Sequence, residues 1–444
     1  MSALASQMVC AGCGAAVSAS ETLPFRCPQA EAGDDIDHLL RCELAPEGLH
    51  EAITASVASA ERSPFLRFRR LMHSYRFARR QGMSDAEYCE LVSELDSAVA
   101  QVDGVGFVET PYIYSRGLDL WVKDETGNVA GSHKARHLMG LAIHLEVVSR
   151  LGLACLGQSE LVIASCGNAA LAAAVVARAA GRRLRVFVPP SASPLVLRRL
   201  RELGALREVC ARKPGDPPGD PCYRRFRAAI KGGALPFSCQ GGDNGLTIQG
   251  GLTLGLEIAI QHRARASSPL AGLFVQVGGG ALASGVFQGL QVAERGGLLP
   301  RRPRLCAVQT ANAHPLLRAF VRARLRARAS DPARAIAEAR RHRHEYMMPW
   351  PDPPESIAEG ILDDETYDWA AIVEALLETD GEVVLADEGT LLRARDLVER
   401  ELELRASATG TAGVAGVLAF RAAAASADDM LMKPVAALIT GVRR

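Results

Sequence analysis

Lysine is rare in this chain, and one lysine lies in a setting that suits covalent chemistry. Among the 51 lysines and arginines only five are lysines: Lys123, Lys134, Lys213, Lys231 and Lys433. A lysine amine can form a Schiff base when burial or crowding removes its proton. Small residues precede Lys134, and the apolar segment 138–148 predicts a helix after it. A lysine in the first turn of such a helix can project into a cleft, where the positive helix end disfavours its protonation.

A second segment, Ser165-Cys166-Gly167-Asn168, suits the binding of an anion. It lies between a predicted strand at 161–164 and a predicted helix at 168–180. Consecutive backbone N–H groups at a helix start can bind a substrate carboxylate. Asn168 offers a donor and an acceptor to an oxygen on a ring cofactor. We interpret Cys166 as a small loop residue, because no His/Asp pair at a recognisable spacing would make it a nucleophile.

A third segment, Gly278-Gly279-Gly280-Ala281-Leu282, follows the predicted strand at 273–277. Glycines let the backbone approach a phosphate closely, with the helix dipole behind it. Gly278, Gly280 and Ala283 also fit the fingerprint of a dinucleotide-binding fold. That fingerprint requires a carboxylate about 20 residues further on, and Glu294 comes too early. The dinucleotide interpretation is therefore the weaker one.

A fourth segment, Ser407 to Gly413, opens a predicted helix at 414–425. A hydroxyl at a helix start is usually an N-cap. If a pyridine nitrogen points there, Thr409 could hydrogen-bond to it without forcing it to stay protonated.

Strands and helices alternate along most of the chain and must position these segments. Helices are expected at 168–180 and 194–203. Strands are expected at 161–164, 184–188, 273–277, 305–309, 383–385 and 436–439. Such alternation predicts an α/β fold with parallel or mixed sheets covered on both faces. Ligands in these sheets lie beyond the carboxyl ends of the strands.

The N-terminal part of the chain has a different character. Residues 1–45 form a cysteine-containing segment, and 46–106 form a helical lead-in in which Ser84 caps a helix at 85–102. Zinc usually takes two tight pairs of ligands. Cys10 and Cys13 make one tight pair, but the sequence after Cys27 (Pro28-Gln29-Ala30) lacks a partner cysteine, and His38 and Cys42 follow at irregular spacing. This pattern predicts that no metal is bound.

Composition argues against several partners. The formal net charge is only +1, whereas nucleic-acid-binding proteins usually carry a large basic excess. Nine arginines between 318 and 343 are followed by acidic residues at 352–368, which predicts local charge compensation rather than a nucleic-acid patch. No uninterrupted apolar run is long enough to span a membrane. An odd number of cysteines, eleven, without a secretory signal predicts a reduced, cytoplasmic location.

In their order along the chain, the four segments resemble the fold type II pyridoxal-phosphate enzymes, the tryptophan synthase β-like superfamily. The resemblance covers roughly residues 110–444 and implies a pyridoxal 5′-phosphate cofactor. It implies Lys134 as the Schiff-base and catalytic lysine, Asn168 as the partner of the cofactor's 3′ oxygen and Thr409 as the partner of the pyridine nitrogen. The phosphate would be held by Gly278, Gly279, Gly280, Ala281 and Leu282, and the substrate carboxylate by Ser165, Cys166 and Gly167.

The resemblance also implies an architecture and a reaction. The catalytic region would span 107–444, with a smaller α/β subdomain at about 136–235, the active site between two α/β domains and a homodimeric assembly. The motifs look most like threonine synthase, which implies a lyase or synthase that removes the α-proton of an amino acid and eliminates or replaces a β or γ group. A serine/threonine dehydratase is the alternative, and an NAD(P)-binding oxidoreductase is a remote one. His133, Ala281 and Ser407-Ala408 depart from the usual pattern.

Overall fold

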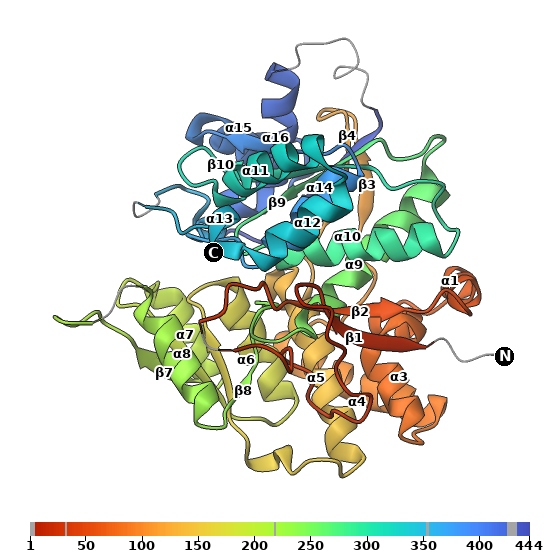
Figure 1. Ribbon diagram of the computed structural model, residues 1–444, viewed down its shortest axis with the longest axis vertical. Coiled ribbons are helices and arrows are strands. Elements are labelled where there is room, and N and C mark those ends of the chain that lie inside the picture. The colour runs from red at the N-terminus through yellow and green to blue at the C-terminus, as the bar shows by residue number, and fades with distance from the viewer. Residues whose placement is uncertain (1–4, 32, 217–218, 352–354, 424–432) are drawn as a thin grey trace.

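The computed structural model describes residues 5–31, 33–216, 219–351, 355–423 and 433–444. Its two larger β-sheets belong to two lobes, stacked one above the other in Figure 1. The six-stranded sheet contains, in spatial order, β11 (Glu382–Ala386), β10 (Arg304–Thr310), β9 (Gly272–Gln276), β12 (Val435–Ile439), β4 (Leu120–Asp124) and β3 (Tyr112–Ser115). The four-stranded sheet contains β7 (Leu206–Val209), β6 (Leu184–Val188), β5 (Leu161–Ala164) and β8 (Leu235–Pro236).

The strands of these two sheets are parallel, except that β3 pairs antiparallel with β4. The six predicted strands are all present, with ends that shift by one residue at most. The predicted α/β fold with parallel and mixed sheets is therefore confirmed. The sequence analysis did not identify β3, β4, β7 and β8, which are short or carry charged residues within apolar runs.

Helices cover both faces of the six-stranded sheet. Leu273 and Val275 of β9 pack into a core with α9 (Thr247–Arg265), α10 (Ala281–Arg295) and α14 (Trp369–Glu378). Phe274, on the opposite face, packs into a core with α15 (Glu388–Leu402) and α16 (Ala408–Ala423). This alternation along one strand is typical of a sheet buried on both sides. The helix α16 begins at Ala408, six residues earlier than predicted, so Thr409 lies in its first turn.

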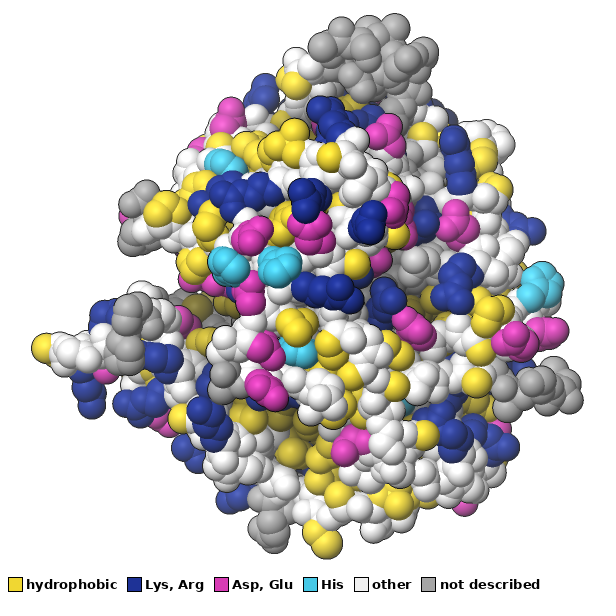
Figure 2. All heavy atoms as spheres, viewed as in Figure 1, with side chains coloured by type: hydrophobic (Ala, Val, Ile, Leu, Met, Phe, Trp, Pro, Cys, Tyr) yellow, Lys and Arg dark blue, Asp and Glu magenta, His cyan; other side chains and the backbone are white. Residues whose placement is uncertain are grey.

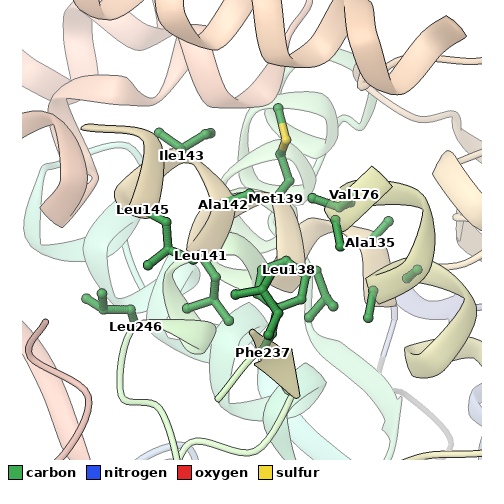
Figure 3. Close-up of a cluster of buried hydrophobic side chains, with 14 of the residues drawn as sticks. Ala135, Leu138, Met139, Leu141, Ala142, Ile143, Leu145, Val176, Phe237 and Leu246 are labelled. Carbon is green, nitrogen blue, oxygen red and sulfur yellow. The ribbon is translucent and has the colours of Figure 1, made fainter. Parts of the chain in front are cut away.

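The helix α5 (Lys134–Arg150) forms the centre of the other lobe. Its side chains are buried nearly all round, and Figure 3 shows Leu138, Leu141 and Leu145 packed toward Phe237 and Leu246. The helices α6 (Asn168–Ala179) and α7 (Pro194–Glu202) contribute to the same core, whereas α8 (Pro221–Lys231) packs against β5 and β6 in a separate cluster. A helix buried on nearly every side lies in a core, so the position of its first residue is strongly fixed.

A buried ionic cluster ties α5 to α9 and β4. The guanidinium of Arg136 donates to Glu125 at 2.8 Å and to Glu257 at 2.6 Å, and Lys123 Nζ donates to Glu257 at 2.6 Å. Each of these side chains is at most 1% exposed. Burial disfavours the charge on Glu257, yet Arg136 and Lys123 together hold its pKa below the ordinary value. The cluster fixes α5 two residues after Lys134, within the first turn of the helix.

The N-terminal part begins along the boundary between the lobes in Figure 1, and its last two helices pack against α5 and α6. It has a two-stranded antiparallel sheet of β1 (Ser6–Cys10) and β2 (Leu40–Leu44). The lead-in contains α1 (Leu49–Ala58), α2 (Pro64–Arg67), α3 (His73–Arg80) and α4 (Asp85–Asp103). Ser84 caps α4 through a capping box with Glu87, which confirms the predicted helix start. None of the helices described by the structure combines the length and apolarity needed to cross a membrane.

The arginine-rich region folds into α11 (Pro315–Ala329), α12 (Pro332–Arg341) and α13 (Arg343–Tyr346). Arg326 pairs with Glu338 at 2.7 Å, Arg340 with Glu374 at 2.7 Å, and Arg343 with Glu365. Figure 2 shows basic and acidic side chains interspersed over this face. Local compensation is thus observed, although two of these acidic partners lie outside the predicted segment 352–368.

Candidate functional site

The four chemical segments meet at one cavity of about 500 Å³. Every predicted site residue lines it: Lys134, Ser165, Cys166, Gly167, Asn168, Gly278, Gly279, Gly280, Ala281, Leu282 and Thr409. They come from the start of α5, from the loops after β5 and β9, and from the start of α16. The carboxyl ends of parallel strands therefore build the site in both lobes, as parallel α/β sheets generally do.

Lys134 is the first residue of α5 and faces this cavity. The preceding turn is fixed to the end of β12, since the backbone N–H of His133 donates to the carbonyl of Thr440 at 3.1 Å and Ser132 forms a bridge with Gly441. Among the residues that the structure describes, no ion pair involves Lys134, in contrast to the paired Lys123. The amine is thus placed in the cavity by a rigid backbone and is not committed to a carboxylate.

Besides α5, which begins at Lys134, two helix starts at the cavity lack side-chain caps. Gly167 precedes α6 and Gly280 precedes α10, and neither helix receives a cap hydrogen bond from a side chain. Gly280 has φ +100°, a conformation that favours glycine. The first N–H groups of a helix have no partner within it, so uncapped starts are suited to anions. The cavity therefore offers two anion-binding positions on opposite lobes.

Asn168 is held by a residue that sequence analysis missed. Arg444 Nε donates to Asn168 Oδ1 at 3.1 Å, and the same guanidinium donates to the carbonyl of Ala130. Since the amide oxygen accepts this bond, the Asn168 Nδ2 group remains the available donor toward the cavity. No motif marks Arg444, because the contact joins positions 276 residues apart.

Two hydroxyls lie at the cavity near the end of β12. Thr409 Oγ1 accepts from the backbone N–H of Gly360 at 3.0 Å, and Thr440 Oγ1 accepts from Gln276 Nε2 at 2.8 Å. Gln276 also donates to the carbonyl of Thr409 at 3.0 Å, which links both threonines. Because each oxygen accepts, each hydroxyl proton is available for donation. Sequence analysis identified Thr409 alone and missed Thr440, the residue directly after the last strand.

Carboxylates close one wall of the cavity. Glu359 and Asp363 line it, and a Cβ on Gly278 would lie only 2.3 Å from Asp363 Oδ2. Burial raises the pKa of Asp363 to about 6, although the charge of Lys134 acts in the opposite direction. Asp368, behind Gly280, is fully buried, and burial raises its pKa to about 8. Asp363 and Asp368 follow no recognisable spacing from the glycine loop, which explains why the sequence did not reveal them.

The remaining cavity residues fit supporting roles. Desolvation raises the pKa of the Cys166 thiol, the opposite of what an activated nucleophile needs. His133 is buried, and burial together with the charge of Lys134 lowers its pKa well below the ordinary value. Its Nδ1 donates to the carbonyl of Thr440 at 3.2 Å. The unusual histidine before the lysine is therefore neutral and braces the loop that carries Lys134.

Comparison with known proteins gives a family for this architecture. The family model described as "Pyridoxal-phosphate dependent enzyme" matches residues 105–441, about three-quarters of the chain. No curated protein matches the sequence.

Solved structures share the fold at low identity. Diaminopropionate ammonia lyase from Escherichia coli is 15% identical, with a TM-score of 0.58 over 87% of this chain and 92% of that chain. Threonine deaminase isoform 2 from Solanum lycopersicum is 16% identical, with a TM-score of 0.57 over 81% and 91%. Serine racemase from maize is 18% identical, with a TM-score of 0.56 over 79% and 92%.

Proposed function

Because the chain belongs to the pyridoxal-phosphate-dependent enzyme family, we propose that it is a lyase acting on an α-amino acid with a leaving group on its β-carbon. One observation carries this proposal. Lys134 lines the same cavity as the uncapped starts of α6 and α10, which belong to opposite lobes. A phosphorylated aldehyde cofactor and an amino-acid carboxylate need such a pair of anion sites and an amine in the same cavity.

The residues present fit pyridoxal phosphate. Gly278 to Leu282 would hold its phosphate at the start of α10, and Asn168 Nδ2 would donate to its ring oxygen. Thr440 or Thr409 would donate to its ring nitrogen. A neutral hydroxyl does not stabilise the protonated form of this nitrogen, whereas a carboxylate would. The bound cofactor supplies covalent attachment of the substrate amine and accepts electron density from the α-carbon.

The chain's own residues would carry out the proton transfer. Ser165 to Gly167 bind the substrate carboxylate through backbone N–H groups, which fixes the α-carbon near Lys134. The Lys134 amine, released from the cofactor by the substrate, takes the α-proton. After the β-substituent has left, Lys134 would displace the product amine from the cofactor, and water would hydrolyse the released enamine, through its imine form, to a 2-keto acid and ammonia.

The charges on the cavity wall favour this dehydratase-type branch. Among the described residues that line the cavity, Lys134 and Arg444 are the only lysine or arginine, and Arg444 already binds Asn168 and Ala130. Glu359 and Asp363 add negative charge. A substrate with its own phosphate would need further cations, whereas a second amino group on the substrate would suit these acids.

A threonine synthase-like reaction is the second candidate. The motif Ser165-Cys166-Gly167-Asn168-Ala169-Ala170 and the N-terminal Cys-x-x-Cys-Gly favour it. In that branch a γ-phosphate leaves, and water adds to the β-carbon to give threonine. It requires that Arg444 release Asn168 to bind the phosphate.

A substrate panel separates these functions. The holoenzyme is incubated separately with serine, threonine, diaminopropionate, O-acetylserine and phosphohomoserine, and keto acid, ammonia and threonine are measured. If the proposal is right, at least one β-substituted substrate gives keto acid and ammonia, and phosphohomoserine does not react. Production of threonine and phosphate from phosphohomoserine would establish the second candidate instead.

We also propose a homodimer in a reducing compartment, as the superfamily resemblance and the cysteine content imply. All eleven cysteines are free thiols in the structure, which agrees with the second part. Light scattering of the purified holoenzyme tests the first part, since a monomer mass at micromolar concentration would contradict it.

A further inference from the structure

The N-terminal segment gathers four potential metal ligands that the catalytic reaction does not use. The ligand atoms of Cys10, Cys13, Cys27 and His38 all lie within 4.8 Å of one another. Cys10 Sγ is 3.4 Å from His38 Nδ1, and Cys13 Sγ is 3.6 Å from Cys27 Sγ. Two sulfurs bound tetrahedrally to zinc at about 2.3 Å are separated by roughly 3.7 Å. The cluster therefore has nearly the size of a coordination shell.

The backbone around these cysteines is shaped for thiolates. The N–H of Cys13 points at Cys10 Sγ at 3.4 Å, and the N–H of Gln29 points at Cys27 Sγ at 3.3 Å. A tight turn joins Gly14 to Cys10, with Gly14 at φ +77°. Two such turns, each aiming N–H groups at a sulfur, stabilise negative charge there. The second turn, at Cys27, exists although its expected partner cysteine is absent.

His38 takes the place of that missing cysteine. Its Nε2 donates to the Asp34 carboxylate at 2.9 Å, which leaves the Nδ1 lone pair directed toward Cys10 Sγ. A carboxylate behind a histidine is the usual support for a metal-bound imidazole. Cys42 lies outside the cluster, on β2 opposite Met8. The irregular spacing in the sequence thus hid a complete set of three sulfurs and one nitrogen.

We propose that Cys10, Cys13, Cys27 and His38 bind one zinc ion. Three thiolates and one imidazole in a tetrahedral arrangement select zinc among the common divalent metals. The four protein ligands fill the coordination shell, so the site is structural and leaves no position for a substrate. It revises the expectation of no bound metal, which rested on the missing second cysteine pair.

The zinc would fix a loop that contacts both lobes. The carbonyl of Thr22 accepts from His144 Nε2 of α5 at 2.7 Å, and the carbonyl of Phe25 accepts from Gly245 N at 2.9 Å. On the other lobe, the N–H of Asp37 donates to the carbonyl of Arg340 in α12 at 2.7 Å. Figure 1 shows this N-terminal segment running along the boundary between the lobes. By joining Cys10 and Cys13 to Cys27 and His38, the zinc ion would hold the loop in the conformation that makes these contacts.

Metal analysis of the full-length holoenzyme tests the proposal. Protein produced with added zinc and purified without chelators should contain about one zinc per chain. The variants Cys13→Ser and His38→Ala should lose most of it, whereas the matched control Cys42→Ser, in the same segment, should retain it. A metal-free wild type, or equal loss in Cys42→Ser, would overturn the proposal.

A second measurement keeps the test decisive if a variant fails to fold. Zinc in the wild-type protein is exchanged for Co²⁺, whose spectrum reports its ligands. Tetrahedral thiolate coordination should give intense visible d–d bands and a near-ultraviolet charge-transfer band, without change in the cofactor absorbance. A weak octahedral spectrum, or a disulfide between Cys13 and Cys27 found by thiol counting of the native protein, would contradict the proposed site.

Discussion

Lys123 and Lys134 lie only eleven positions apart in the chain, yet their surroundings differ completely. Lys123 is 0% exposed and spends all three donors on Glu257, Gln261 and the carbonyl of Thr110. Lys134 lines a cavity together with two uncapped helix starts. A buried lysine whose three N–H donors all have acceptors has a structural role. A lysine that lines a cavity beside unpaired backbone N–H groups can instead react with a bound molecule.

The largest expected effect comes from removing the cavity lysine. Lys134→Ala should lower turnover by at least about 1,000-fold and abolish the visible absorbance of the bound cofactor, since the amine both attaches the cofactor and takes the proton. The thermal unfolding midpoint should change little. Lys213→Ala, at an exposed lysine, serves as the control, and a Lys134→Ala variant with turnover close to that of this control would contradict the catalytic role of Lys134.

Replacing Lys123 should lower the stability and leave the turnover nearly unchanged, the reverse of the effect expected for Lys134. Lys123→Ala should cost about 3 kcal/mol in the free energy of unfolding, because it leaves Arg136 as the one charged partner of Glu257 within the buried cluster and removes a donor from Gln261 and from the carbonyl of Thr110. The variant that remains folded should keep the cofactor absorbance and most of the turnover. Denaturant unfolding and steady-state rates measured side by side check this, and unchanged stability would refute the structural role.

A region can be predicted from sequence when the residues that determine its position lie close together in the chain. Lys134, Asn168 and the glycine loop each sit directly between a strand and a helix, so their placement follows from short-range pattern. The ionic cluster joins Lys123 to Glu257, 134 positions away, and no pattern in either segment specifies the other.

The same reason explains what was missed at the site. Arg444, Asp363 and Thr440 reach the cavity only through the packing of distant segments. His38 joins the cysteines from a stretch without regular spacing. The strand ends were predictable because apolar runs end at glycines or polar turns, but the antiparallel β3 depends on its neighbour and not on its own sequence.

A smaller effect separates the two hydroxyls at the cavity. Thr440→Val should reduce turnover by roughly tenfold and shift the cofactor absorbance, because it removes a hydrogen bond toward the ring and the acceptor of Gln276. Thr440→Ser should restore both. If Thr409→Val gives these changes and Thr440→Val does not, Thr409 is the partner of the ring nitrogen.

A further expected effect concerns the pH dependence of stability. Asp368 has its pKa raised by burial from the ordinary 3.8 to about 8 in the folded protein. The folded state therefore binds more protons than the unfolded state between these values, so stability from this group is greatest at low pH and is lost as pH rises toward about 8. Asp368→Asn should flatten this decline in unfolding midpoint between pH 5 and 8. An unchanged slope would contradict the assignment.

The site of cofactor attachment tests the central claim most directly. The holoenzyme is reduced with borohydride, digested and mapped by mass spectrometry, and the five lysines leave few alternatives. The account predicts a single pyridoxyl label on the peptide that contains Lys134. A label on Lys123 or on a surface lysine, or a reduced protein without label, would contradict it.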